Sequence, residues 1–193
     1  LKKEVDADFA AYEPTQAARR IQSFADSHLS NWYVRLCRRR FWKGEYSEDK
    51  IAAYQTLYEC LSTISKLIAP ISPYFSDWLF KNLNDVSQLE SHPSVHLVDF
   101  PQPVDGAIDK ALEERMDYAQ RISSLVLSLR KKDNLRVRQP LKRILLPVLN
   151  PEFQGQVEAL KDLIMAEVNV KDIEYITDTS GIIKKKAKAN FKT

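Results

Sequence analysis

The stretch LSNWYVRLCRRRFWK, residues 29–43, decides how this chain is built, and the rest of the sequence can be interpreted outward from it. It contains two tryptophans, one tyrosine, one phenylalanine and four arginines. A buried helix does not hold that many arginines, and a solvated helix does not need that many aromatic rings. We therefore expect one side of the stretch to pack inside the protein and another side to meet a partner molecule.

A long amphipathic helix is predicted around this stretch. Residues of one face recur at spacings of three and four, which is the period of an α-helix. They are Ile21, Ala25, His28, Leu29, Trp32 and Leu36. Pro14 suits the first helical turn, and no further Pro or Gly interrupts the chain before Gly44. The pattern predicts a continuous helix to about Lys43, in which Trp32 and Leu36 pack against the rest of the protein.

Two more helices are predicted after a turn at residues 44–46. Ser47 can cap the first of them, which has acids in its first turn and ends before Pro70. Residues 72–73 begin a shorter helix. Its inward face is predicted to comprise Phe75, Leu79 and Leu83. Residues 84–106 lack a helical period, so we expect a long connection laid across the helices.

The last third of the chain changes in character. Asp105 is expected to cap a third long helix, and residues 143–149 and 170–176 are strand-like segments separated by a helical pattern. We predict a mainly α fold, with an antiparallel helical bundle over residues 1–133 followed by a small α/β appendage over residues 134–193. Both ends of the chain break off within a pattern, so we expect a fragment of a longer protein.

The composition is that of a soluble, cytoplasmic protein. Of the 193 residues, 44% are hydrophobic, and no membrane span or signal peptide is indicated. Cys37 and Cys60 have no metal ligands nearby in the sequence and are expected to be reduced thiols. The net charge of +3 is small, but bases concentrate in residues 35–43, 130–143 and 184–192. These three blocks are candidates for contact with an acidic partner.

A helical wheel gathers four polar and aromatic residues on one face beside the apolar stripe. They are Asn31, Arg35, Arg38 and Trp42. A stacking indole, guanidinium forks and an amide that can read a base edge are groups that bind unstacked RNA loops. We predict that this face binds RNA. Arg39 lies nearer the stripe, so it either pairs with a buried carboxylate or lies where the helix projects beyond the core; we favour the projection, with Arg39 in contact with the RNA backbone. In the structural alternative, Trp42 packs on the next helix and the arginines are solvated or paired with acids such as Glu45 and Glu48.

Two other basic segments are weaker candidates for contact with RNA. Arg136 and Arg138 alternate in a segment expected to be extended, so both side chains would point the same way and contact phosphates. Salt bridges from these two arginines to the bundle are an equal alternative. The C-terminal lysines are expected to be a solvated run, or to bind RNA without specificity and with strong salt dependence. They are Lys184, Lys185, Lys186 and Lys188.

Catalytic constellations are missing from the sequence. His28, His92 and His96 have no matching nucleophile or carboxylate and are expected to be structural. The four glycines form neither a dinucleotide fingerprint nor a P-loop. We expect no cofactor and no metal in this chain, and no chemistry from it alone.

Several short sequence motifs of the chain resemble those of one family. LSNWYVRLCRRRFWK, DKIAAYQTLYECL and LIAPISPYFSDWLF are similar to the anticodon-binding domain of the isoleucyl-tRNA synthetases, which are class I aminoacyl-tRNA synthetases. SVHLVDFP, NLRVRQPL, MAEVNVKDIEY and KAKANFKT resemble successive motifs of the C-terminal part of that family. The resemblance covers nearly the whole chain, and the RRRFW form separates it from the related valyl and leucyl enzymes. The pair Leu36-Cys37 departs from the family, which often has a polar or basic residue there.

The resemblance implies a function in tRNA recognition. The parent enzyme would join isoleucine to its tRNA using ATP and magnesium, and this chain would bind the anticodon stem-loop. The residues predicted above to bind RNA would then be the tRNA contacts: Asn31, Arg35, Arg38, Arg39, Trp42, Arg136 and Arg138. The signatures HIGH and KMSKS are absent, so catalytic and editing domains are expected upstream, and a C-terminal cysteine-rich zinc module is absent too. The second hypothesis is a non-enzymatic helical scaffold that binds protein partners through the same aromatics.

Overall fold

The computed structural model describes residues 1–148 and 150–177, so the predicted role of the C-terminal lysine run lies outside the described residues. The chain folds as two compact units, Leu1–Ile108 and Asp109–Thr193. The first contains α1 (Lys2–Ala10), α2 (Pro14–Ser23), the π-helix η1 (Phe24–Val34), α3 (Arg38–Trp42), α4 (Glu48–Ile68), α5 (Pro73–Ser87), and the short 3-10 turns η2 (Val95–Leu97) and η3 (Asp105–Ala107). The second contains α6 (Lys110–Lys132), β1 (Ile144–Pro147), α7 (Pro151–Glu158), α8 (Lys161–Val168) and β2 (Ile173–Ile176).

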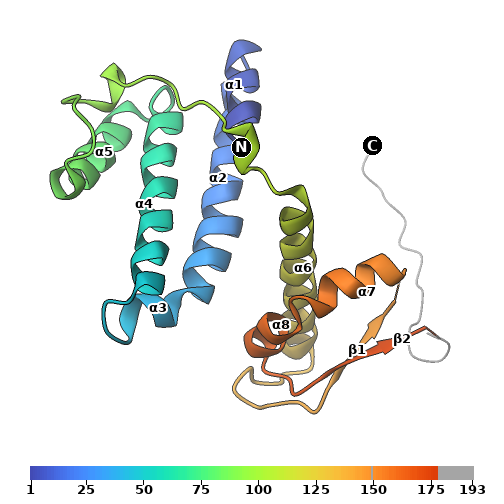
Figure 1. Cartoon of the computed structure of the whole chain (residues 1–193). Coiled ribbons are helices and arrows are strands. Elements are labelled where there is room, and N and C mark those ends of the chain that lie inside the picture. The colour runs from blue at the N-terminus through green and yellow to red at the C-terminus, as the bar shows by residue number, and fades with distance from the viewer. Residues whose placement is uncertain (149, 178–193) are drawn as a thin grey trace. The chain divides into compact units, whose positions relative to one another are not determined.

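The first unit is a helical bundle with a main apolar core and a smaller apolar cluster formed by Ala69, Phe80 and Val95. Within it, α2 and α4 lie side by side, and α3 lies at the end where they connect (Figure 1). The core residues come from α1, α2, η1 and α4. They are Val5, Ala17, Ile21, Leu29, Ile64 and Leu67. Phe100, from the connection after α5, packs edge-on against Phe9 at 6.1 Å between ring centroids, as expected for a segment laid across the helices.

The predicted single helix over residues 14–43 is a run of three helical segments. Between α2 and α3, residues 24–34 adopt the π form, whose turns hold more residues than α-helical turns. Trp32 is buried as predicted, at 8% exposure, but the next buried residue is Cys37, five positions later, and Leu36 is only half-buried. The wider turn also places His28 on the exposed surface, so its assignment to the apolar stripe is wrong.

The predicted starts of α4 and α5 are confirmed, but the inward face of α5 and the cap of α6 differ from the prediction. Ser47 caps α4, because its hydroxyl accepts a hydrogen bond from the Lys50 amide, and Pro73 stands at the start of α5. The inward face of α5 is formed by Ser76 and Phe80, whereas Phe75 is exposed. The N-cap of the third long helix, α6, is Asp109. The predicted cap, Asp105, instead begins η3.

The second unit joins a long helix to a β-α-β element. Strands β1 and β2 are parallel, with Ile144 opposite Ile173, and α7 and α8 lie between them in the chain. The predicted mainly α fold with a small α/β appendage is therefore confirmed. The compact units divide between residues 108 and 109, because α6 packs on α7 and α8. The division of functions at 133 and 134 stays a prediction.

The described helices include none that is long and apolar enough to cross a membrane. Cys37 and Cys60 are both free thiols, as predicted, with Cys37 buried in the bundle. Burial raises the pKa of the Cys60 thiol above its ordinary value.

Candidate nucleic-acid interface

Helix α3 presents a basic and aromatic hollow on the surface of the bundle. The hollow has a volume of about 440 Å³ and is lined by Arg38, Arg39, Trp42 and Lys43. Arg38 and Trp42 are four residues apart and share a face of the helix, whereas Lys43 directly follows the helix in extended backbone. Trp42 is 80% exposed, so it does not pack on the next helix as the structural alternative required.

The chemistry of this hollow suits an anionic, aromatic partner. Three cationic side chains from one short segment offer donors for phosphate oxygens, and the exposed indole offers a flat face for stacking. Base stacking on an aromatic side chain contributes about 1–3 kcal/mol per base. The combination is typical of surfaces that bind single-stranded or looped nucleic acid, because duplex bases are already stacked on each other.

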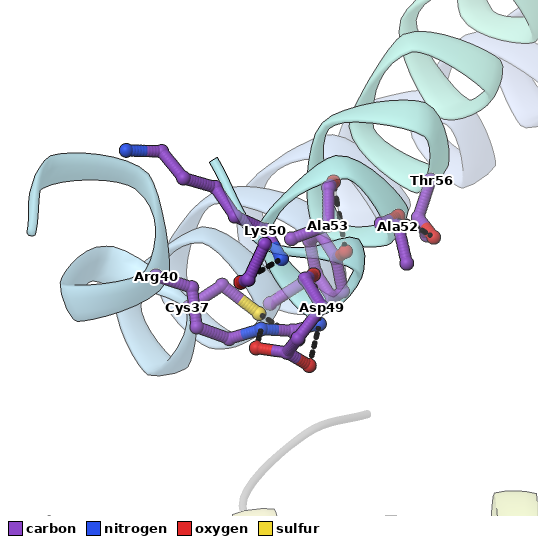
Figure 2. A network of polar contacts seen from close by, with 9 residues as sticks. Cys37, Arg40, Asp49, Lys50, Ala52, Ala53 and Thr56 are labelled. Atoms are coloured by element: carbon purple, nitrogen blue, oxygen red, sulfur yellow. Dashed lines mark hydrogen bonds and ion pairs between the residues drawn. The ribbon is translucent and has the colours of Figure 1, made fainter. Parts of the chain in front are cut away.

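The side of α3 away from the hollow is held on α4 by a two-pronged ion pair. Nε of Arg40 donates to Oδ2 of Asp49 at 2.8 Å, and Nη2 donates to Oδ1 at 2.7 Å (Figure 2). Nη2 also donates to the backbone carbonyl of Asp49 at 2.8 Å, and Nη1 to Sγ of Cys37 at 3.4 Å. The hydrogen bonds to Asp49 raise the pKa of Arg40 above its ordinary value. Arg40 is thus engaged within the protein.

Aromatic contacts continue this attachment along α4. The rings of Phe41 and Tyr54 lie 5.1 Å apart between centroids, and the Tyr54 hydroxyl donates to the Phe41 carbonyl at 3.2 Å. From the π-helix, the Tyr33 hydroxyl donates to the carbonyl of Ala53 at 3.1 Å, and burial raises the pKa of Tyr33. The start of α4 therefore meets residues on both sides of the break at Cys37.

The turn from α3 to α4 has its own supports. Gly44 adopts φ +82°, a left-handed conformation that residues with a Cβ rarely adopt. Lys50 reaches back from α4, where Nζ donates to the Gly44 carbonyl at 3.4 Å and lies 4.9 Å from the centroid of the Tyr46 ring. These contacts order the chain immediately after the hollow.

Asn31 and Arg35 lie upstream of the hollow and do not line it. Both side chains are exposed. The predicted common face assumed about 100° per residue, which holds for an α-helix but not through the π-helix. The helical wheel that placed these two residues beside Arg38 and Trp42 assumed a continuous α-helix, and that assumption is wrong. Their contact with RNA stays a prediction.

Arg136 and Arg138 lie in a turn of the second unit, so the expected extended segment is wrong. The amide of Gln139 donates to the Arg136 carbonyl at 3.0 Å, which closes the turn. Both arginine side chains are exposed. The turn is held by Arg130, whose guanidinium is buried at 2% exposure and donates to backbone carbonyls. Arg130 thus belongs to the protein interior although it lies in a basic block of the sequence.

A second hollow of the first unit is a poorer match for RNA. Its volume is about 410 Å³, and its lining includes Arg19, Arg20 and His28 but also Glu4. Nε of Arg20 donates to Asp8 at 2.6 Å, so its charge is neutralised within the protein. Among the described residues, no group of three or more potential ligands from His, Cys, Asp and Glu could hold a metal ion.

Sequence reasoning missed three functional neighbours of the predicted site. Lys43 lines the hollow, and its place directly after Trp42 in a basic block is a signal that could find it. The sequence pattern assigns no role to Arg40, and it marks Asp49 only as an acid in the first turn of the helix that begins after Ser47. The pairing of these two residues depends on the geometry of the turn at Gly44, which no sequence spacing shows.

Comparison with known proteins identifies the family. Residues 1–145 match the family model described as the anticodon-binding domain of tRNA ligase, and the chain belongs to this family. It is 57% identical over 192 residues to an isoleucine–tRNA ligase of Cytophaga hutchinsonii and 50% identical over 192 residues to that of Bacteroides thetaiotaomicron. Each of these alignments covers 100% of the chain. An isoleucine–tRNA ligase of Dehalococcoides mccartyi is 42% identical over 171 residues, or 89% of the chain. The chain spans only 16–17% of the length of these relatives.

Proposed function

We propose that this chain is the part of an isoleucine–tRNA ligase that recognises the anticodon stem-loop of the tRNA. The observation that carries the proposal is the hollow on α3, where three cations surround one exposed indole in a chain of the anticodon-binding family. An anticodon loop offers phosphates for the cations and unstacked bases for the indole. The proposed contacts are Asn31, Arg35, Arg38, Arg39 and Trp42, with Arg136 and Arg138 on the RNA backbone, and Lys43 is added to them.

The proposed contacts divide into two roles. Trp42 is the residue suited to stacking on a base, because its indole is exposed and flanked by cations. Arg38 and Arg39 supply planar guanidinium forks, which bind phosphate through two parallel hydrogen bonds. Asn31 is the proposed reader of a base edge, since its amide both donates and accepts. Sequence specificity would come from the amide, because stacking tolerates any base, and most of the affinity would come from the cations and the stacking.

The activity of the whole enzyme is proposed from the relatives. Proteins named isoleucine–tRNA ligase would attach isoleucine to tRNA with ATP and magnesium, in the cytoplasm where translation takes place. The hollow of this chain is suited to binding and orienting the RNA, and the chemistry would belong to further domains of the longer polypeptide. Three exposed aromatics on α5, Tyr74, Phe75 and Trp78, form a surface that such a domain could cover.

A titration with short RNA hairpins tests the proposal. Fluorescence anisotropy would follow the binding of a labelled isoleucine anticodon stem-loop to the 193-residue chain, beside a hairpin of the same stem with a scrambled loop. We expect tighter binding of the native loop and an affinity that falls steeply with salt, because phosphate contacts release counterions. Equal affinity for both hairpins would refute anticodon recognition. A protein-binding scaffold would show neither the loop preference nor the strong salt dependence.

A further inference from the structure

We infer that Arg40 is a positioning residue of the candidate interface. Through its fork on Asp49 it holds α3 on the start of α4, and it thereby sets where Arg38 and Trp42 meet the RNA. The RNA part of this inference rests on the proposed function, but the attachment of α3 can be measured without RNA.

Helix α3 cannot hold its own position. It has only five residues and buries none of them, and isolated helices of that length do not form in water. Its ends are not continuous with regular helix either. Cys37 has ψ 1°, which breaks the helical run before α3, and Lys43 is extended after it. Contacts with neighbouring elements must therefore fix the helix.

The position of Arg40 on α3 suits it to this task. It lies two residues from Arg38 and two residues from Trp42, which is about 200° around a helix from each. While those two side chains line the hollow, the Arg40 guanidinium lies against the first turn of α4, with both carboxylate oxygens of Asp49 within 2.8 Å (Figure 2). A planar fork on a carboxylate fixes direction as well as distance. The ion pair therefore restrains the rotation of α3 as well as its separation from α4.

Neutralisation by Asp49 separates the role of Arg40 from that of the hollow arginines. A guanidinium that already binds a carboxylate and a backbone carbonyl has few donors left for phosphate. The Asp49 carboxylate is itself an anion close to a surface proposed to bind RNA. By charge alone, removing it would strengthen RNA binding, whereas loss of positioning would weaken it. The two explanations thus predict opposite signs.

The variant Asp49→Ala uses this difference, and Glu48→Ala is its matched control. Both replace an acid in the first turn of α4 and remove the same charge, but the described contacts of Arg40 go to Asp49 and not to Glu48. We expect Asp49→Ala to weaken binding of the anticodon stem-loop about two- to fivefold, because the ion pair is solvent-exposed. Glu48→Ala should leave binding unchanged or slightly tighter. Equal or tighter binding by Asp49→Ala would overturn the inference.

Hydrogen exchange of the free protein gives a second readout. The amides of Phe41 and Lys43 donate to the carbonyls of Cys37 and Arg39 at 3.1 and 3.0 Å, so they report on opening of α3. Asp49→Ala should speed their exchange about two- to fivefold, with exchange in the bundle core unchanged. Unchanged exchange at both amides would refute the positioning role whatever the RNA does. If the wild-type chain failed to bind the stem-loop, the proposed function would fail while the exchange data still decided this inference.

Discussion

Replacing Arg130 by Met should destabilise the second unit strongly. In the structure, Nη1 donates to the carbonyls of Arg136 and Gln139, both at 3.0 Å, and Nη2 donates to the carbonyl of Asn169 at 2.8 Å. The guanidinium thus joins the end of α6 to the turn after it and to the residue that ends α8. Methionine fills a similar length of the site but donates no hydrogen bond, so three carbonyls lose a partner.

The magnitude follows from these three bonds and from the burial of the charge. A hydrogen bond to a charged group contributes about 1.5–3 kcal/mol, so three give roughly 4.5–9 kcal/mol. Burying a guanidinium costs several kcal/mol, and this cost is relieved in the variant. We expect a net loss of about 3–5 kcal/mol in the free energy of unfolding of the second unit, because breaking a buried polar network typically costs that much.

Native-state hydrogen exchange measures this loss within the second unit. The amide of Ile164, a fully buried residue of α8, donates to the Leu160 carbonyl at 3.0 Å and reports on opening of the unit. The control is Arg121→Met on the same helix, where an exposed arginine pairs with Asp117 and should contribute less than about 1 kcal/mol. A loss below about 1 kcal/mol for Arg130→Met would refute the role of its three bonds.

Two further predictions concern the first unit. Hydrogen bonds, first from Lys81 and then from Ser94, lower the pKa of Asp77 from 3.8 to about 2 in the folded protein. The stabilisation that the ionised Asp77 contributes is therefore present above pH 3.8 and is lost as the pH falls from 3.8 to 2. Asp77→Asn should accordingly cost more stability in urea unfolding at pH 6 than at pH 3, and an equal cost at both pH values would contradict this. For the surface on α5, a thiol introduced as Tyr74→Cys should react rapidly in the 193-residue chain, where Tyr74 is 91% exposed, and slowly in the longer ligase that is proposed to contain it. Equal labelling rates in the two proteins, read by peptide mapping, would show that no domain covers it.

The elements with local signals were predictable from the sequence. Ser47 and Pro73 mark helix starts through backbone chemistry that does not depend on the rest of the fold, and the structure places helices there. The β-α-β order of the second unit followed from the change of period alone. Arg130, in contrast, looked like part of a basic surface block. Its burial arises from carbonyls of Arg136 and Asn169, which the chain brings together only when folded.

The π-helix explains why only some of the predicted site residues line the hollow. Residues 24–34 contain no Gly or Pro that would mark a change of helix type. The apolar pattern is too short to distinguish the wider turns of a π-helix from those of an α-helix. Arg38 and Trp42 were grouped correctly because both lie beyond the π-helix, within α3, where a spacing of four keeps its meaning. Asn31 lies inside the π-helix, so the wheel carried no information on its relation to them.

The central claim is that the hollow on α3 binds the anticodon loop, and a double substitution in it gives the most direct measurement. Arg38→Ala with Trp42→Ala removes one cation and the exposed indole, while Arg19→Ala with Trp78→Ala removes the same chemistry from exposed positions elsewhere in the unit. We expect the first pair to weaken binding of the isoleucine anticodon stem-loop by at least about tenfold and to reduce the salt dependence by about one phosphate contact. The second pair should bind like the wild type. Unchanged affinity and salt dependence for the first pair would show that the RNA binds elsewhere.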